Sequence, residues 1–367
     1  MPHIHIGYSP FKACAAAGLV FGFALIMVLT SLSNLSLWIA GAIPFVAIAT
    51  FLGLAITVKV LTGVERLTHY HHQVTIISVV TFLVLLLHQP ILPYLDILLL
   101  GIGMFTVCGR IGCLMAGCCH GRPHHWGICY KPEHAEEGFP SYLVGVRLLP
   151  VQAMESIWVF MIVVSGTLLV LTGAPAGAAL AWYIVAYGLG RFMLEFLRGD
   201  PERPYFWGYS EAQWTSIILV TGVVAAEMAG SLLFSWLHVG VAAILVITLL
   251  TVILFRRLDE KATHKLLHPR HIKEIAEAIG ILPVSKPTDV RVACTTLDIC
   301  VSASMIETDK QIVHLYTLSS GQGTLKKEAA HILARLIKQL THYPVTGTMV
   351  EGENGLFHLF LPHVIQK

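Results

Sequence analysis

Charge is scarce in this chain of 367 residues, of which Asp, Glu, Lys and Arg make up only 13%. Soluble domains usually carry about 25%, and hydrophobic residues here reach 55%. This composition excludes an ordinary soluble protein for most of the chain. The net charge is only +2 and no basic tract occurs, so nucleic acid is not expected as a partner.

The apolar residues gather in runs that suit membrane helices, which need about 20 residues to cross the hydrocarbon core. We predict spans at 13–33, 37–60, 73–90, 95–116, 150–172, 177–197, 214–235 and 238–255. The first run lacks a clear cleavage site and is interpreted as a retained span. The predicted fold class is an all-α polytopic membrane protein, with about 7–8 transmembrane helices and a small α/β soluble C-terminal domain.

Lys and Arg are absent from four long stretches, 13–58, 73–109, 148–190 and 204–255. With eight spans, every positive charge then lies at one end of the bundle. The positive-inside rule predicts that this end is cytoplasmic. We therefore expect a multi-pass protein of the inner (plasma) membrane whose C-terminal domain is cytoplasmic.

A change in composition near residue 258 predicts two domains, a transmembrane one at 1–257 and a soluble α/β one at 258–367. In the second, "HIKEIAEAIG" and "TLKKEAAHILARLIKQL" have helical spacing, and "RVACTTLDICVSASMI" and "QIVHLYTL" are rich in strand formers. "GTMVEG" and "GLFHLFL" flank a Gly-Glu-Asn-Gly turn and predict a hairpin. The role of this domain is not predicted.

An ionisable residue within a membrane span is costly and indicates function. Tyr187, Arg191 and Glu195 follow one another at intervals of four residues, so they share one helical face. A phenol, a guanidinium and a carboxylate on one stripe suit anion recognition. The alternative is a structural Arg191–Glu195 pair that ties helices together.

Three histidines, His69, His71 and His72, stand where the third predicted span begins. A histidine there could act as a general base, because its pKa lies near neutrality. The alternative is that they are solvated loop residues.

Acidic and amide side chains also enter the predicted spans. Gln152 and Glu155 in "PVQAMES" lie at a helix start, whereas Asp96 and Glu227 are isolated carboxylates. We expect Glu227 to be structural.

The segment "CGRIGCLMAGCCHGRPHHWGICY", residues 108–130, concentrates cysteine, histidine, arginine and glycine. Its glycines and Arg110 predict a phosphate cradle of backbone N–H groups beside a fixed guanidinium. The cysteines lack the paired C-x₂₋₄-C spacing of zinc sites, so no metal is predicted. Disulfides are not expected on a cytoplasmic face. The candidate nucleophiles or ligands are Cys113, Cys118, Cys119 and His120; packing of the loop is the alternative.

Several segments together resemble the prolipoprotein diacylglyceryl transferase family. "GRIGCLMAGCCHGRP" resembles its signature loop and "YHHQVTIIS" the segment with its essential histidine. "LPVQAMES", "YGLGRFMLEFLRGD" and "AQWTSI" resemble three further family segments. The resemblance covers roughly residues 65–220.

The resemblance implies a transferase of lipoprotein biosynthesis, which moves the diacylglyceryl group of phosphatidylglycerol to a prolipoprotein thiol and releases glycerol phosphate. It implies that Arg110 and Arg191 hold the phosphate and that His71 is the base. The other residues implied at the substrate site are Tyr187, Gln152, Glu155, Glu195, Gly112, Gly117 and Gly121. No cofactor is expected, and the expected partners are a membrane phospholipid and a protein or small thiol acceptor.

The chain departs from the family at Cys113, where Asn is common, and at Cys118, where an acidic residue is common. The acceptor is therefore left open. The family also works from the extracytoplasmic leaflet, opposite to the orientation that the charges predict. The alternative hypothesis is a non-catalytic lipid- or metal-binding membrane protein that retains the transferase fold. A transporter fits less well, because no inverted repeat is visible.

Overall fold

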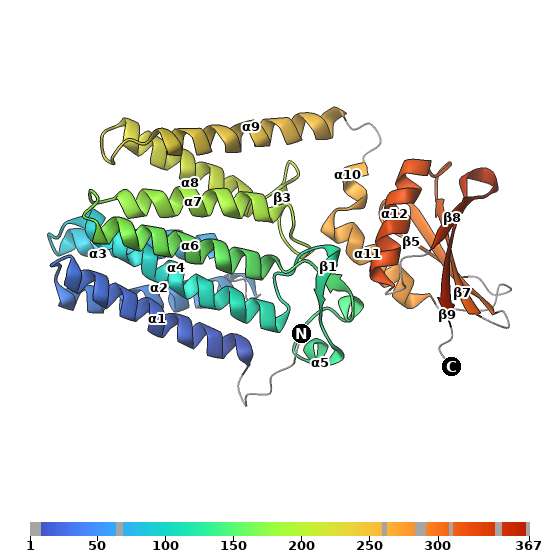
Figure 1. Cartoon of the computed structure of the whole chain (residues 1–367), viewed down its shortest axis with the longest axis horizontal. Helices are drawn as coiled ribbons and strands as arrows, with labels where there is room; N and C mark the ends of the chain where they lie inside the picture. The colour runs from blue at the N-terminus through green and yellow to red at the C-terminus, as the bar shows by residue number, and fades with distance from the viewer. Residues whose placement is uncertain are drawn as a thin grey trace.

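The computed structural model describes residues 9–63, 69–258, 263–282, 291–307, 311–341 and 347–364. Within these ranges the long helices lie side by side in a bundle (Figure 1). They are α1 (Pro10–Leu32), α2 (Leu37–Thr62), α3 (His69–Leu86), α4 (Ile91–Ala116), α6 (Val151–Leu171), α7 (Ala178–Glu195), α8 (Glu211–Met228) and α9 (Trp236–Leu258). Each predicted span thus corresponds to a helix.

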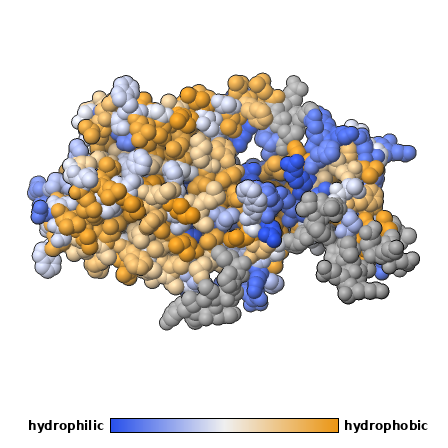
Figure 2. Space-filling model, in the orientation of Figure 1, coloured by the Kyte–Doolittle hydropathy of each residue, from blue (hydrophilic) through white to orange (hydrophobic). Residues whose placement is uncertain are grey.

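Five of the described helices, namely α1, α2, α4, α6 and α9, are long and apolar enough to cross a membrane. Helix α3 is apolar but shorter, over Tyr70–Leu86. Apolar side chains cover much of the bundle surface, whereas hydrophilic ones gather at one end (Figure 2). The chain is therefore a polytopic membrane protein, and the count of 7–8 spans stays a prediction.

Glycine and capping side chains set several helix ends. Helix α2 ends at Gly63 and α4 at Gly117, whose φ angles of 71° and 80° are left-handed. Helix α8 begins with a capping box, in which Ser210 and Gln213 satisfy each other's backbone N–H groups. The bundle helices therefore stop where the local sequence favours a stop.

The connections differ at the two ends of the bundle. At one end they are short, whereas at the other residues 117–150 form what we call the head segment. It contains β1 (Pro123–Cys129), α5 (Pro132–Glu136), η1 (Ser141–Leu143) and β2 (Arg147–Leu148), and β1 pairs antiparallel with β2. At the same end, β3 (Tyr205–Phe206) and β4 (Tyr209–Ser210) form a hairpin between α7 and α8.

Beyond α9 the chain forms a mixed α/β unit. It contains α10 (Thr263–Leu266), α11 (Pro269–Ile281), β5 (Val292–Cys294), β6 (Ile299–Glu307), β7 (Gln311–Ser320), α12 (Lys327–Leu340), β8 (Thr348–Glu351), η2 (Glu353–Gly355) and β9 (Phe357–Val364). The strands form an antiparallel sheet in the order β5-β6-β7-β9-β8. The predicted strands, helices and hairpin are confirmed, and Cys294 in β5 is disulfide-bonded to Cys300 in β6.

The α/β unit packs on the head segment, at the end of the bundle where the long connections lie (Figure 1). Tyr130 and Leu148 of the head segment share one hydrophobic cluster with Ile275 of α11 and Leu336 of α12. The Arg270 guanidinium adds polar contacts by donating to the carbonyl oxygens of Pro201 and Arg203, both at 3.3 Å. The division into domains at residue 258 stays a prediction.

Candidate active site

Glu155, at the start of α6, is the buried centre of the site, with 1% of its surface exposed. Its Oε2 pairs with Arg110 Nε from α4 at 2.9 Å and with Arg191 NH1 from α7 at 3.3 Å. The Tyr187 hydroxyl donates to its Oε1 at 3.1 Å. The predicted polar stripe on α7 therefore faces a carboxylate and an arginine from two other helices.

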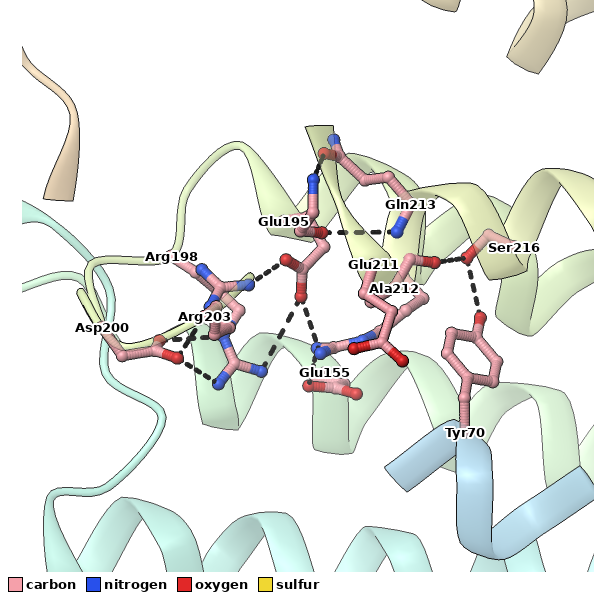
Figure 3. Close-up of polar contacts among 12 residues, drawn as sticks. Tyr70, Glu155, Glu195, Arg198, Asp200, Arg203, Glu211, Ala212, Gln213 and Ser216 are labelled. Carbon is pink, nitrogen blue, oxygen red and sulfur yellow. Dashed lines mark hydrogen bonds and ion pairs between the residues drawn. The ribbon is translucent and has the colours of Figure 1, made fainter. Parts of the chain in front are cut away.

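Glu195 forms a second carboxylate centre at the end of α7 (Figure 3). It pairs with Arg191 at 2.6 Å, with Arg198 at 3.9 Å and with Arg203. The Arg191–Glu195 pair considered from the sequence is thus present, but as one part of a larger network.

Asp200 completes this network. It accepts two hydrogen bonds of 3.0 Å from Arg198 and pairs with Arg203 at 2.8 Å. Across the described network, four guanidiniums (110, 191, 198, 203) face three carboxylates (155, 195, 200), which leaves a formal charge of 4 − 3 = +1. A singly charged anion such as a phosphodiester would neutralise it.

Arg191 has capacity for such an anion. Its Nε is buried and has no hydrogen-bond partner among the described residues. A buried N–H of a charged group that lacks a partner is costly. The arrangement therefore favours an additional acceptor at this position.

Charge and burial act on the groups around the network. Burial lowers the pKa of Arg203 to about 10, and the nearby charge of Arg191 adds to this. Burial opposes the charge of Arg198, but Cys119 and Asp200 raise the pKa of this guanidinium well above its usual range. Hydrogen bonds from Cys113 and Cys118 lower the pKa of the Cys119 thiol, assisted by the positive charges of Arg198 and Arg110.

His71, the predicted base, lies at the edge of the site. Its side chain is 59% exposed and contacts the carboxylate of Glu211 at the start of α8. No contact between His71 and the arginine network appears in the described part of the chain. His72 is instead buried and packs on Phe51, with ring centroids 4.5 Å apart; the side chain of His69 lies outside the described residues.

The glycines of the signature segment serve packing. A side chain at Gly112 would meet Cys14 and Phe11 of α1, and one at Gly121 would lie 2.4 Å from the Leu149 carbonyl oxygen. The Gly117 and Gly121 N–H groups donate to the Cys113 and Leu149 carbonyls at 2.9 and 3.1 Å. These two N–H groups are thus engaged and do not form the predicted phosphate cradle.

Gln152 orders the loop after α4. Its Nε2 donates to the Cys118 carbonyl oxygen at 2.8 Å. The sulfur atoms of Cys113, Cys118 and Cys119 lie within 4.8 Å of one another. His120 contacts the Gly121 carbonyl through Nδ1 at 2.9 Å and is buried.

The isolated carboxylates have structural contacts. Asp96 of α4 accepts from the N–H groups of Gly177 and Leu180 at 2.7 and 2.6 Å and so caps α7. Glu227 pairs with His238 of α9, in line with the structural role expected for it.

Sequence reasoning missed part of the site. Arg198, Asp200 and Arg203 were not among the predicted site residues, and the hydrogen bond of 2.7 Å between Tyr70 and Ser216 had no sequence signal. For Arg198, the spacing in "EFLRGDPER" did contain a sequence signal. Arg198 follows Glu195 by three residues, which places it within reach at a helix end.

The helical bundle and the buried cluster together define a polytopic membrane protein with an internal, net-positive network of arginines and carboxylates. The sequence comparisons then show which family this part of the chain resembles. Residues 72–228 match the family model of prolipoprotein diacylglyceryl transferase. This segment, from α3 to α8, is similar to that family over the motifs named above.

Curated relatives agree with this match. A phosphatidylglycerol–prolipoprotein diacylglyceryl transferase 2 of Clostridium perfringens is 34% identical over 137 residues, 36% of this chain and 50% of that protein. The enzyme of Clostridium tetani is 32% identical over 112 residues, 30% of this chain and 43% of that protein. One from Dehalococcoides mccartyi is 28% identical over 126 residues, 34% of this chain and 46% of that protein. The chain spans half or less of the length of these relatives.

Proposed function

We propose that this protein transfers the diacylglyceryl group of phosphatidylglycerol to a thiol and releases glycerol phosphate. The observation that carries the proposal is the buried cluster of four arginines and three carboxylates inside the segment that matches the family. The relatives named above are phosphatidylglycerol–prolipoprotein diacylglyceryl transferases.

The reaction is a displacement at carbon. The acceptor sulfur, as a thiolate, attacks the glyceryl carbon that bears the phosphate, and the carbon–oxygen bond to the phosphate breaks. Glycerol phosphate leaves with the bonding electrons, so negative charge develops on its oxygen. Arg110 and Arg191 are positioned by Glu155 to neutralise that charge, and all three side chains are buried.

The remaining predicted residues have supporting roles in this proposal. Tyr187 and Glu155 fix the two arginines, and Glu195 holds Arg191 from its other side. Gln152, Gly112, Gly117 and Gly121 shape the loop beside them. His71 would accept the thiol proton at the exposed edge, where an acceptor can arrive from the head end of the bundle.

The acceptor we propose is a cysteine thiol, either of a prolipoprotein, as in the names of the relatives, or of another protein. The protein would lie in the inner (plasma) membrane. The charge distribution supports a cytoplasmic head end and α/β unit. The Cys294–Cys300 disulfide supports the opposite orientation, since such bonds persist in oxidising compartments.

A reconstituted assay tests the proposal. Phosphatidylglycerol labelled in its headgroup glycerol is supplied with and without a peptide that carries a prolipoprotein cysteine, and water-soluble glycerol phosphate is measured. Arg191→Ala and Arg110→Ala should each lower release by about 100- to 1,000-fold, the loss typical of one preorganised electrostatic contact. Arg257→Ala is the matched control, because Arg257 is exposed at the end of α9.

Peptide-dependent release would establish a prolipoprotein cysteine as acceptor, and release only with membrane extract would indicate another acceptor. No release under either condition would contradict the proposed activity and favour a binding protein with the transferase fold. Full activity in Arg191→Ala would contradict the assigned site.

A further inference from the structure

The cysteines that replace the usual family residues converge with a third cysteine in space. Cys113 is on the last turn of α4, and Cys118 and Cys119 follow in the loop. Gly117 and Cys119 both have left-handed φ angles, 80° and 56°, which turn the chain back on the helix end. All three sulfur atoms consequently lie within 4.8 Å of one another.

This separation suits a metal ion. Zinc binds thiolate sulfur at about 2.3 Å, so two sulfurs on one tetrahedral zinc are about 3.8 Å apart. The three sulfurs are free of disulfides and need only small movements to reach that spacing. Three sulfur ligands select soft cations over magnesium or calcium.

The surroundings of the cluster match the charge of such a site. Three thiolates and one Zn²⁺ carry a net charge of −1, and the Arg198 and Arg110 guanidiniums are near enough to interact with Cys119. The loop is also held in place, because the Cys118 carbonyl accepts from Gln152 at 2.8 Å. A preorganised, positively charged surrounding stabilises an anionic metal–thiolate centre.

We propose that Cys113, Cys118 and Cys119 bind one zinc ion whose fourth position takes the acceptor thiol. His120 does not join the converging group in the described part of the chain, so three protein ligands remain. Three protein ligands with one open position are the pattern of a catalytic rather than a structural zinc site. Cys118 is exposed, which leaves the cluster open to an incoming ligand.

The zinc deepens the proposed function by activating the nucleophile. Zinc would lower the pKa of an acceptor thiol that binds it, so that the thiol gives up its proton to the base His71 at neutral pH and becomes a thiolate. Its sulfur then attacks the glyceryl carbon, and glycerol phosphate departs with the electron pair of the broken carbon–oxygen bond. The site thus places the sulfur nucleophile within the electrostatic influence of Arg110 and Arg198, two members of the arginine network.

Metal binding is tested on the full-length protein in detergent, reduced and then freed of metal with a chelator. Zn²⁺ is added and bound metal is measured, and Co²⁺ serves as a spectroscopic probe of tetrahedral thiolate coordination. We expect one equivalent per chain, with a sulfur-to-cobalt charge-transfer band. Both signals should be lost in Cys118→Ser and in Cys119→Ser. Cys129→Ser, in β1 of the same head segment, should keep them.

The outcomes separate this site from the proposed function. Absence of zinc or cobalt binding in the reduced protein, or retention in both cluster variants, overturns the metal site whatever the activity. Glycerol phosphate release without any bound metal overturns the site and leaves the transferase proposal standing. Bound metal without release supports the site and contradicts the transferase proposal.

Discussion

At the residue scale, one carboxylate joins three helices. Glu155 of α6 pairs with Arg110 of α4 and Arg191 of α7 while it is almost completely buried. The buried guanidiniums of Arg110 and Arg191 depend on the Glu155 carboxylate as counter-ion, because water cannot reach them to replace it. Removal of Glu155 should therefore affect stability as well as chemistry.

We expect Glu155→Ala to destabilise the protein by about 3–5 kcal/mol, the usual loss when one partner of a buried ion pair is removed. Glu155→Gln should lose less stability than Glu155→Ala, since the glutamine amide oxygen still accepts a hydrogen bond. Thermal unfolding in detergent measures both. Glu211→Ala is the control, because its partly exposed pair with His71 should contribute at most about 1 kcal/mol. Equal unfolding midpoints for Glu155→Ala and wild type would contradict the central role of this carboxylate.

At the scale of elements, α7 is held at both ends by side chains from elsewhere. Its first turn is capped by Asp96 of α4 and its last turn enters the arginine network. The cap fixes the position of α7 along its axis relative to α4. It thereby also fixes where Tyr187 and Arg191 lie relative to Glu155. The site geometry therefore depends on a contact at the far end of the helix.

We predict that Asp96→Ala lowers the free energy of unfolding by about 1–3 kcal/mol, the cost of a buried donor left unsatisfied. Asp96→Asn keeps one acceptor oxygen and should lower the free energy of unfolding by roughly half as much as Asp96→Ala. Thermal unfolding gives the comparison, and headgroup release from phosphatidylglycerol reports any shift of α7. An Asp96→Ala variant as stable as Asp96→Asn would show that the cap contributes little.

At the scale of the whole molecule, the α/β unit and the site share one end of the bundle. His268 lies at this junction, where its ring packs on Tyr205 at 4.6 Å and its Nδ1 accepts from the Arg270 N–H at the start of α11. Burial lowers the pKa of His268 to about 4, and the positive charges of Arg270, Arg122, Arg256 and Arg203 act in the same direction. The docked state therefore holds this histidine neutral.

Docking should consequently weaken in acid. The pKa in the folded state lies below the ordinary value of about 6.5, so the unfolded chain binds the proton more readily between these values. The stabilisation is complete above about pH 6.5 and is lost as pH falls towards 4. Unfolding midpoints measured from pH 7 to pH 4.5 should fall more steeply for wild type than for His268→Asn, which can still cap α11. Identical profiles would contradict this role.

Orientation is a second prediction at this scale. If the disulfide forms in the cell, the α/β unit faces an oxidising compartment. A membrane-impermeant maleimide applied to intact cells, before and after reduction, should then label the exposed Cys294 only after reduction. Labelling that requires permeabilised cells would instead support the cytoplasmic placement predicted from charge. The double variant Cys294→Ser/Cys300→Ser gives the background labelling from the other cysteines of the chain.

The sequence by itself determined the local structure of this protein and part of its site. Apolar runs predicted the bundle helices, segments rich in strand-forming residues predicted the strands of the α/β unit, and a four-residue spacing placed Tyr187 and Arg191 on one face of α7. These features depend on neighbours in the chain, which periodicity records. The family motifs predicted roles for Arg110 and Arg191 for the same reason, since each motif is a short segment.

Only the tertiary structure decided which segments meet. It placed Glu155 between two arginines 45 residues before and 36 residues after it, added Arg198 and Arg203 to the network, and brought the three sulfurs together. The C-x₄-C-C spacing gave no zinc motif, because the sulfurs converge through a helix end and two left-handed residues rather than through a regular spacing. Such contacts follow from how helices pack and how a loop turns, and neither is encoded in any one short segment of the chain.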